Sequence, residues 1–333
     1  MKFAIVGCGL IGQKRLRSLR ADDRVVVVAD PVLARAQALA GQARGAAAVA
    51  DWRAAVENPE VEAVFVSTSN DALAPVTLAA IEAGKHVLVE KPAARAPAEL
   101  LPAIAAAEAR GVCVQVGFNH RYHPALQQAR KLLDAGELGP LMFIRGRYGH
   151  GGRIGYDKEW RAKPEVSGGG ELLDQGVHLI DLARWFMGDF PHVQGHVATF
   201  FWDMPVEDNG FLLLRTAGGQ VAWLHATWTE WKNTFSFEIT GRDAKLHIEG
   251  LGGSYGVERL SFYKMKPAMG PPDTTIWEYP GEDHSWRIEL EAFTKAIASR
   301  SPPPVGLRDA HAALTIVHQV YALSRPAWWP TAS

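Results

Sequence analysis

The sequence predicts two domains of different architecture. Residues 1–120 should form an α/β domain with a doubly wound parallel sheet, and residues 121–333 an α+β domain with a large, open, mostly antiparallel sheet. The chain opens on an apolar run that ends in a glycine-rich turn, and strand-like and helix-like segments then alternate as far as Gly117. This alternation is typical of parallel sheets. Beyond Gly117 strand-like segments follow one another with few helices, which favours an antiparallel or mixed sheet.

The first thirteen residues, MKFAIVGCGLIGQ, have the pattern of a dinucleotide-binding turn. The apolar run Lys2–Val6 ends in GCGLIG, which fits G-x-G-x-x-G, and leucines at helical spacing follow it. Gly7 permits the tight turn, Gly9 lets the backbone approach a pyrophosphate, and Gly12 lets the helix pack closely on the strand. The N–H groups at the start of that helix would face the phosphates. A glycine turn directly after an apolar strand therefore predicts a Rossmann domain.

A second apolar run, VVVVA, stops at Asp30, 18 residues beyond Gly12. This is close to the spacing of about 20 residues expected of an acid that binds the adenosine ribose. Such an acid accepts both ribose hydroxyls and repels a 2′-phosphate, so we expect NAD as cofactor, with NADP less favoured. The residues expected at the cofactor are Gly7, Gly9, Leu10, Ile11, Gly12, Asp30, Ser67, Thr68, Asn70, Glu90 and Lys91.

Periodicity and turn residues place the remaining elements. In the first domain we expect helices at residues 32–40, 72–83 and 98–110, and strands at residues 61–66, 86–89 and 112–116. In the second domain we expect helices at residues 124–135, 171–187, 286–299 and 307–324. Strands are expected there at residues 141–148, 193–202, 210–216, 221–229, 234–240, 244–248, 259–264 and 275–279. A glycine-rich, charged loop covers residues 149–170.

Composition excludes several classes of function. The formal net charge of −1 gives no electrostatic reason to expect nucleic acid or an anionic membrane as a partner. No run approaches the roughly 20 apolar residues that span a bilayer. The two cysteines, Cys8 and Cys113, have no metal-ligand spacing, so we expect neither a metal nor a disulfide framework. A reducing, cytoplasmic location follows.

Glu90-Lys91-Pro92 directly follows a strand of the predicted parallel sheet. Ligands of doubly wound folds lie at the carboxyl ends of the strands, so Lys91 is a candidate active-site residue. Pro92 keeps the residue before it extended and could follow a cis peptide bond. A surface lysine in a turn after the strand is an equally good interpretation of the spacing alone.

Asp174, His178 and Asp181 stand at i, i+4 and i+7 of the predicted helix 171–187 and so share one helical face. The rest of this helix is mostly apolar and should be buried. A buried acid–His–acid stripe is costly without partners or a purpose, which favours proton transfer. A histidine satisfied by neighbouring hydrogen bonds is one alternative. A metal site is another, and without a further ligand motif it is poorly supported.

The segment GFNHRYHP follows the strand at residues 112–116. Asn119 and Arg121 in this segment could face the same cleft as Lys91. Polar residues in an interdomain linker are an equally good interpretation.

Four of these motifs together resemble one family. GCGLIG, Glu90-Lys91-Pro92, GFNHRYHP and Asp174-x-Gly176-x-His178-x-x-Asp181 look like the successive motifs of the glucose–fructose oxidoreductase / inositol dehydrogenase (Gfo/Idh/MocA) family. The resemblance extends from residue 2 to about residue 190, with the motifs in the same order. It implies a Rossmann domain, a C-terminal domain on a large open sheet, and reversible NAD-dependent oxidation of a secondary alcohol on a sugar or cyclitol.

The resemblance also implies roles for individual residues. Lys91 resembles the catalytic lysine of the family, Asp174 its substrate-binding aspartate, and His178 its proton acceptor. An imidazole suits removal of an alcohol proton near neutral pH, and a lysine cation can stabilise a developing alkoxide. Whether Lys91 or His178 takes the proton first stays open. The expected substrate-binding residues are Asn119, Arg121, Tyr148, Trp160, Asp174 and His178.

The substrate class rests on the loop ahead of the 171–187 helix. Aromatic and basic residues gather in or beside it: His150, Arg153, Tyr156, Lys158, Trp160, Arg161 and Lys163. Aromatic faces suit sugar rings and basic side chains suit phosphate or carboxylate groups, which predicts a nucleotide-linked or otherwise anionic sugar. The alternatives are an inositol or free-sugar dehydrogenase, an NAD-dependent glycosidase of the same fold, and a catalytically silent nucleotide sensor. Most of the tryptophans could instead fill a sheet interface.

Assembly is predicted from the second half of the chain. Apolar and aromatic residues recur there at strand spacing: Phe200, Trp202, Phe211, Leu213, Trp223 and Trp228. An open sheet needs cover on both faces, so one face should pack on helices and the other on a second subunit. The sequence therefore predicts a homodimer or homotetramer that associates through the C-terminal sheet, as the family resemblance also implies.

Overall fold

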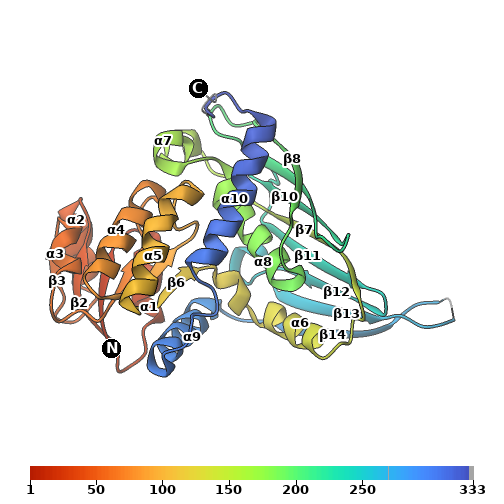
Figure 1. The fold of residues 1–333 in the computed structure, drawn as a ribbon, viewed down its shortest axis with the longest axis horizontal. Helices are drawn as coiled ribbons and strands as arrows, with labels where there is room; N and C mark the ends of the chain where they lie inside the picture. The colour runs from red at the N-terminus through yellow and green to blue at the C-terminus, as the bar shows by residue number, and fades with distance from the viewer. Residues whose placement is uncertain (269, 330–333) are drawn as a thin grey trace. The chain divides into compact units, whose positions relative to one another are not determined.

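The computed structural model describes residues 1–268 and 270–329 (Figure 1). The chain divides into two compact units. Unit 1 contains Met1–Phe118, Glu165–Gly168 and Trp286–Leu314, and unit 2 contains Asn119–Pro164, Gly169–Ser285 and residues 315–329, apart from residue 269. This division differs from a single boundary at residue 120, because a late segment of the chain returns to unit 1.

The returning segment carries α9 (Ser285–Ser299), which covers one face of the unit 1 sheet. Leu290 and Phe293 of α9 are fully buried in one apolar core with Phe3, Ile5 and Phe65 of the sheet. No local pattern in a helix tells which of two sheets it will cover. The assignment of this helix therefore depends on tertiary packing.

Unit 1 is built on the predicted parallel sheet, which is confirmed. Its six strands lie in the order β3-β2-β1-β4-β5-β6, and all neighbours are parallel. They are β1 (Lys2–Val6), β2 (Arg24–Ala29), β3 (Ala47–Val49), β4 (Ala63–Val66), β5 (His86–Glu90) and β6 (Val114–Gly117). Burial on both faces explains why these strands are nearly continuous apolar runs. Strand β3 was not predicted, since AAV is too short and too rich in alanine to indicate a strand.

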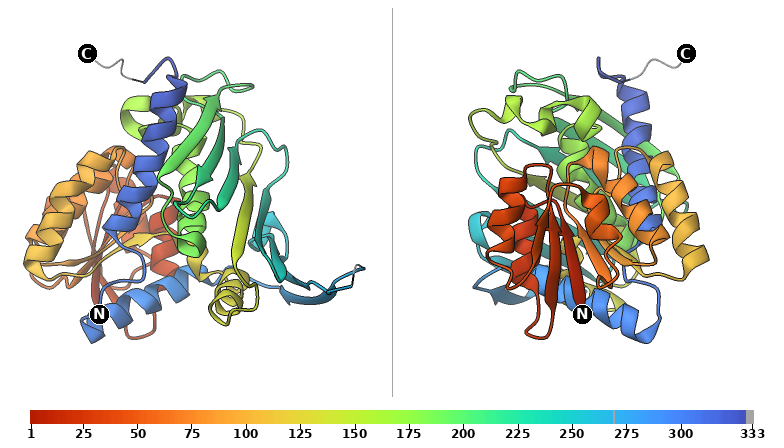
Figure 2. Two further views of the ribbon diagram at one scale, coloured as in Figure 1. Left: turned by 45° about the vertical axis from the view of Figure 1, so that its right-hand side comes forward. Right: turned by 90° about the vertical axis from the view of Figure 1, so that its left-hand side faces the viewer.

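Helices lie on both faces of this sheet (Figure 2, right). Besides α9 they are α1 (Leu10–Ser18), α2 (Leu33–Ala40), α3 (Trp52–Val56), α4 (Asn70–Glu82) and α5 (Leu101–Arg110), the last preceded by a 3₁₀ turn at Pro97–Leu100. Gly84 follows the end of α4 with φ +73°, a left-handed conformation that glycine adopts without strain. The predicted end of this helix is confirmed.

Unit 2 is built on an eight-stranded sheet in the order β14-β13-β12-β11-β7-β10-β9-β8. Only the β7–β10 pair is parallel, so the predicted mostly antiparallel sheet is confirmed. The strands are β7 (Leu141–Gly149), β8 (His192–Ala198), β9 (Asn209–Arg215), β10 (Val221–Thr227), β11 (Thr234–Gly241), β12 (Ala244–Glu249), β13 (Glu258–Lys264) and β14 (Asp273–Tyr279). Buried and less buried residues alternate along β10 and β11, as expected when helices cover one face.

The covered face of this sheet packs on two helices from the first part of unit 2. Helix α8 (Val177–Met187) packs on β7 and β10, and α6 (Pro124–Asp134) on β12, β13 and β14. The remaining helices are α7 (Pro164–Ser167) and α10 (Leu307–Ser324). Short 3₁₀ turns lie at Asn119–Tyr122, Tyr156–Lys158, Trp160–Ala162 and Gly253–Tyr255.

Two predicted elements of unit 2 need correction. The expected α-helix at residues 171–187 begins with a π-helical turn at Leu172–Gly176, and α-helical geometry starts only at Val177. The strand expected at residues 193–202 ends at Ala198, because the next residues fold around a buried carboxylate. Within the described part of the chain, none of the helices combines the length and the apolar character needed to cross a lipid bilayer.

Candidate functional site

The glycine turn of unit 1 is packed too closely for side chains. Gly7 has φ +94°, and a Cβ on it would lie 2.4 Å from the backbone oxygen of Ser67, which follows β4. A Cβ on Gly12 would lie 2.1 Å from the oxygen of Gly7. These two contacts bring the turn against the ends of β1 and β4 and let α1 begin directly after it.

Gly9 has a different environment, which suits a bound dinucleotide. Apart from Gly9 itself and its two chain neighbours, no atom of the described residues lies within 4 Å of the position that a Cβ on Gly9 would take. The residue before α1 is Gly9, which has no side chain that could cap the helix. The backbone N–H groups of the first helical turn, at Leu10, Ile11 and Gly12, are therefore of the kind that bind phosphates. The turn offers both the space and the donors that a pyrophosphate needs.

Asp30 lies at the end of β2, beside this turn, and is buried. Its Oδ2 accepts the N–H of Cys8 at 3.0 Å, and its Oδ1 accepts the N–H of Val32 at 2.9 Å. Each carboxylate oxygen has two lone pairs, so both can accept one more hydrogen bond. Asp30 is thus fixed in place and can still receive a pair of hydroxyl groups.

The other cofactor residues predicted after β4 lie where β4 meets α4. Ser67 donates its backbone N–H to Val6 at 2.7 Å, and Thr68 donates its hydroxyl to the oxygen of Ser69 at 3.0 Å. The side-chain amide of Asn70 donates to the backbone oxygen of Ser167 at 2.8 Å. Ser67 and Thr68 are the two residues that Gly7 approaches closely.

The Glu90 carboxylate, at the end of β5, belongs to a buried ion-pair network. The guanidinium of Arg15 on α1, fully buried, lies 2.5 Å from Glu90 Oε1 and 2.5 Å from Glu289 Oε2 on α9. Lys91 follows, half-buried, and is joined to Pro92 by a cis peptide bond. The network holds the end of β5 against α1 and so fixes the backbone from which Lys91 extends.

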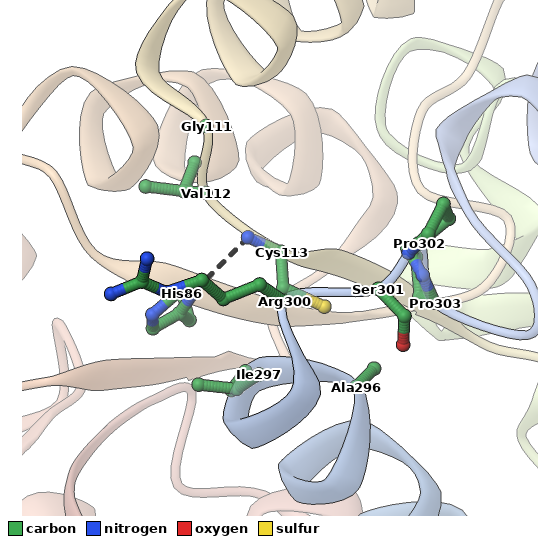
Figure 3. A pocket seen from close by; sticks show the side chains of 10 residues that line it. All are labelled: His86, Gly111, Val112, Cys113, Ala296, Ile297, Arg300, Ser301, Pro302 and Pro303. Carbon is green, nitrogen blue, oxygen red and sulfur yellow. Dashed lines mark hydrogen bonds between the residues drawn. The ribbon is translucent and has the colours of Figure 1, made fainter.

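A cavity of about 390 Å³ lies at the opposite end of the parallel strands (Figure 3). His86 begins β5 there, and its Nδ1 accepts the N–H of Cys113 at 3.0 Å. The end of α9, with Ile297 and Arg300, forms the other wall. None of the predicted site residues lines this cavity, which agrees with the location of doubly wound fold sites at the carboxyl ends of the strands.

In unit 2, Asp174 lies in the π-helical turn and is paired with the loop before it. Arg161 Nε donates to Asp174 Oδ2 at 3.1 Å, and the Arg161 guanidinium lies 4.5 Å from the centre of the Trp160 ring. Burial opposes the charge on Arg161, but together with Asp174 the net effect is a raised Arg161 pKa. Arg161 is therefore a permanent cation that orients the carboxylate of Asp174.

His178 lies in the first turn of α8 and is buried. Its ring is stacked on that of His120, with the centres 3.8 Å apart and the planes 14° apart. Tyr148 of β7 meets His120 at 5.0 Å and His178 at 6.2 Å, in both cases edge to face. Burial raises the pKa of Tyr148 well above its ordinary value, so its phenol stays protonated.

The predicted polar residues of GFNHRYHP have separate partners. Arg121 Nε donates to Asp181 Oδ2 at 2.8 Å and Arg121 Nη2 donates to Asp181 Oδ1 at 2.6 Å. This is a buried bidentate ion pair with α8. Asn119 donates its side-chain amide to the Ser285 hydroxyl at 2.9 Å. Asp181 thus anchors the segment to α8, while Asp174 pairs with the loop. The three polar residues expected to share one helical face have different environments.

A buried acid, Glu207, is hydrogen-bonded to the N-terminal end of the π-helical turn. Glu207 accepts the Tyr321 hydroxyl at 2.6 Å and the backbone N–H of Leu172 at 3.2 Å. Its backbone oxygen accepts the N–H of Glu171 at 2.9 Å. Burial raises the pKa of Glu207 to about 7, although the hydrogen bond from Tyr321 opposes the shift. The N-terminal end of the turn that carries Asp174 is therefore held by Glu207.

Sequence reasoning missed Arg15, His120 and Glu207. Arg15 lies between two carboxylates that are distant in sequence, and Glu207 meets Tyr321 across 114 positions. His120 belongs to the GFNHRYHP motif. Its position between Asn119 and Arg121, both predicted site residues, was the only signal in the sequence that pointed to it. Across residues 1–268 and 270–329, no three His, Cys, Asp or Glu side chains are placed to share a metal ion.

Comparisons with known proteins agree with this architecture. Among curated proteins, the chain is similar to levoglucosan dehydrogenase of Pseudarthrobacter phenanthrenivorans, with 32% identity over 171 residues, 51% of this chain and 44% of that protein. The chain thus matches less than half the length of that relative. It is also similar to D-glucoside 3-dehydrogenase of Escherichia coli, with 27% identity over 350 residues, 98% of this chain and 95% of that protein.

A solved structure of levoglucosan dehydrogenase in complex with NADH has the same fold. Its TM-score is 0.85 at 23% identity, covering 97% of this chain and 98% of that chain. Two family models also match. The one described as an oxidoreductase family with an NAD-binding Rossmann fold matches residues 1–118, and the GFO/IDH/MocA C-terminal domain matches residues 126–247. These matches confirm the resemblance and the NAD-binding class of the first domain. The chain belongs to the GFO/IDH/MocA family of oxidoreductases.

Proposed function

We propose that the protein is an NAD-dependent dehydrogenase that interconverts a secondary alcohol and a ketone on a sugar or cyclitol. The observation that carries the proposal is the buried imidazole of His178, which stacks on His120 and meets Tyr148 edge to face. Named relatives of the chain are dehydrogenases of levoglucosan and of D-glucosides. When bound, NAD⁺ supplies the acceptor for the hydride that leaves the carbinol carbon.

The residues of the chain then have distinct tasks. His178 accepts the hydroxyl proton, because a neutral imidazole is a suitable base near neutral pH. Its stacking on His120 fixes the plane of the ring. Asp174, oriented by Arg161, accepts hydrogen bonds from substrate hydroxyls. Lys91 supplies a cation that stabilises a developing alkoxide.

The geometry of the loop favours a neutral polyol. Arg153 lies 2.6 Å from Glu159, and Arg161 is paired with both Glu159 and Asp174. The two arginines expected to bind an anionic group are therefore already neutralised by acids of unit 2. A nucleotide-linked or otherwise anionic sugar is the second candidate, supported by the exposed Lys158 and Lys163 on the same loop.

Formation of NADH with a substrate panel tests the proposal. The panel contains inositols, free hexoses, methyl glycosides, uronic acids, and UDP-, GDP- and dTDP-sugars. We expect turnover with neutral members and its loss in His178→Ala, whereas His284→Ala, exposed and outside the sheet, serves as the matched control. Turnover confined to nucleotide sugars or uronic acids would select the second candidate. Release of free sugar without net NADH would instead indicate a glycosidase.

We also propose a homo-oligomer formed through the uncovered face of the unit 2 sheet. Trp223 of β10 and Leu213 of β9 are direct neighbours on this face, with 47% and 44% of their surfaces exposed. Phe211 stacks on His225 beside them at 4.3 Å. Of the other residues expected at the interface, Phe200 and Trp202 lie in the loop after β8 and Trp228 is fully buried.

A reducing, cytoplasmic location stays part of the proposal. Cys8 and Cys113 are both buried and carry free thiols. Burial, with a contribution from Asp30, raises the pKa of Cys8 to about 12, and burial raises that of Cys113 to about 11. Neither thiol is readily ionised, which supports a structural role for both.

A further inference from the structure

The loops at the end of the unit 2 sheet display a group of aromatic side chains that the proposed reaction does not use. Phe200, Phe201 and Trp231 have 68%, 58% and 63% of their surfaces exposed. Phe201 meets Trp231 edge to face at 4.5 Å and Trp202 at 5.3 Å. We call Phe200, Phe201, Trp202 and Trp231 the aromatic ledge. Exposed apolar patches of this kind usually mark binding surfaces.

The ledge is held in place by a buried carboxylate. Asp208, fully buried, accepts the backbone N–H groups of Phe200, Phe201 and Trp202 at 2.9, 2.8 and 3.0 Å. Its Oδ1 also accepts the side-chain amide of Asn209. Hydrogen bonds to a charged acceptor are among the stronger ones in proteins. The loop therefore presents its aromatic rings from a fixed backbone.

Trp231, the ledge residue that comes from the other loop, is also held in a defined conformation. Trp231 has φ +57°, a left-handed conformation that is rare and costly for a bulky side chain. Two glycines of the neighbouring loop make room for the ledge, Gly151 for Trp231 and Gly152 for Trp202. A Cβ on Gly151 would lie 3.1 Å from Trp231 Cα, and one on Gly152 would lie 2.5 Å from the Trp202 ring. Backbone strain held by its surroundings is characteristic of ligand-binding positions.

The ledge is continuous with the residues proposed to bind the substrate. The Trp202 ring lies 6.0 Å from that of Tyr156, which packs on the fully buried Trp228 at 4.8 Å. Trp202 Nε1 donates to the backbone oxygen of Trp228 at 3.1 Å. The backbone oxygen of Tyr156 accepts the N–H of Glu159 at 3.2 Å, and Arg161, which lies 3.8 Å from Glu159 Oε2, donates to Asp174 Oδ2 at 3.1 Å. A line of aromatic rings thus leads from the surroundings of Asp174 to exposed Trp231.

We propose that the aromatic ledge binds the second ring of a glycoside substrate, so that the preferred substrates are disaccharides or larger glycosides rather than single-ring sugars. This rests on the proposed function of the same site. Flat aromatic faces match the C–H faces of a pyranose. The exposed Arg153, paired with the half-buried Glu159 and 5.4 Å from the Tyr156 ring, offers donors for hydroxyl groups.

A second copy of the chain is the competing occupant, and the size of the patch disfavours it. A stable interface buries roughly 800 Å² per partner and involves about 20–30 residues. The ledge is four side chains, a size that suits one or two sugar rings. A preorganised backbone also lowers the entropy lost when a small ligand binds.

Matched pairs of sugars test the proposal. The pairs are methyl β-D-glucoside with cellobiose, methyl β-D-galactoside with lactose, and methyl α-D-glucoside with maltose. In the wild-type protein we expect kcat/KM to be at least tenfold higher for the disaccharide of one pair. In Phe201→Ala/Trp231→Ala that ratio should fall about tenfold, which corresponds to two aromatic contacts. Leu323→Ala, exposed on α10, is the control and should keep the wild-type ratio. Trp231→Ala alone should give a smaller fall.

Two further measurements separate the possible failures. Disaccharide binding, followed by calorimetry, does not need turnover. If no sugar is oxidised but cellobiose, lactose or maltose binds the wild type and not the double variant, the dehydrogenase proposal fails and the ledge stands. The ledge proposal is overturned if the ratio of kcat/KM values is the same in the double variant as in the wild type. It is also overturned if the wild type neither binds nor oxidises any disaccharide. A lower mass of the double variant by light scattering identifies the ledge as a subunit contact and also overturns it.

Discussion

The Asp30 carboxylate is hydrogen-bonded to the glycine turn itself, with Oδ2 3.0 Å from the backbone nitrogen of Cys8. The acid that should select the cofactor ribose and the turn that should bind the pyrophosphate are therefore one rigid unit. Gly9 leaves the space beside them open. This arrangement supports NAD rather than NADP, since a 2′-phosphate would approach a fixed negative charge.

We therefore expect the wild-type protein to bind NADH more tightly than NADPH, and Asp30→Asn to reduce this preference by about tenfold. The amide oxygen of Asn can still accept the Cys8 N–H, while the charge that repels a phosphate is lost. Fluorescence titration with both cofactors measures the ratio. Asp51→Asn, at the exposed start of α3, is the control. Tighter NADPH than NADH binding in the wild type would contradict the prediction.

Lys91→Ala and His178→Ala should each lower turnover by about two or more orders of magnitude, as removal of an acid–base group does. NADH affinity should change little in either variant, because the glycine turn and Asp30, which supply most of the expected cofactor contacts, stay intact. Turnover is measured with the best substrate of the panel. Lys295→Ala and His284→Ala, both exposed, are matched controls. Wild-type turnover in either active-site variant would remove that residue from the mechanism.

Glu207 predicts a pH dependence of stability. Its folded pKa of about 7 lies above the ordinary value of 4.5, so the folded state holds this proton more tightly than the unfolded state. The free energy of unfolding should therefore fall as pH rises from about 4.5 to about 7, by at most about 3 kcal/mol, and change no further from this group above pH 7. Urea unfolding at several pH values measures the slope.

The matching variant is Glu207→Gln, whose amide oxygen can accept from Tyr321 and Leu172 without ionising. We expect it to remove this part of the slope and to be more stable than the wild type at pH 8. Glu249→Gln, at the exposed end of β12, is the control. An identical pH slope in wild type and Glu207→Gln would show that Glu207 does not titrate in this range.

Arg15→Met should destabilise the full chain by about 3–5 kcal/mol, because it leaves the buried Glu90 and Glu289 without their shared cation. Arg17→Met, on the exposed side of the same helix, should change stability by less than about 0.5 kcal/mol. Chemical unfolding gives both values. Equal stabilities of the two variants would mean that the network contributes little.

Trp223→Glu should lower the mass of the protein in solution, because a charge is placed in the proposed subunit interface next to Leu213. Light scattering at micromolar concentration measures this. Leu323→Glu, also at an exposed apolar residue but on α10, should keep the wild-type mass. A monomeric wild type would overturn the proposed oligomer.

What the sequence determined by itself was local. The turn after β1 needs glycine at residues 7, 9 and 12 for reasons of backbone conformation and close packing, so the dinucleotide motif could be recognised from adjacent residues. Asp30 followed from its spacing to that turn. Buried parallel strands are continuous apolar runs, and the antiparallel strands of unit 2 are separated by turn residues, so both sheets could be predicted from periodicity.

What only the tertiary structure decided concerns residues far apart in the chain. Arg15 meets Glu289 across 274 positions, and Glu207 meets Tyr321 across 114. Helical periodicity placed Asp174 and Asp181 on one face with His178. In the structure Asp174 lies in a π-helical turn and pairs with Arg161 of the loop, whereas Asp181 pairs with Arg121. Charge pairing, ring stacking and the return of α9 to the first sheet depend on which surfaces meet in three dimensions. The pattern of neighbouring residues in the sequence does not tell which distant residues will be in contact.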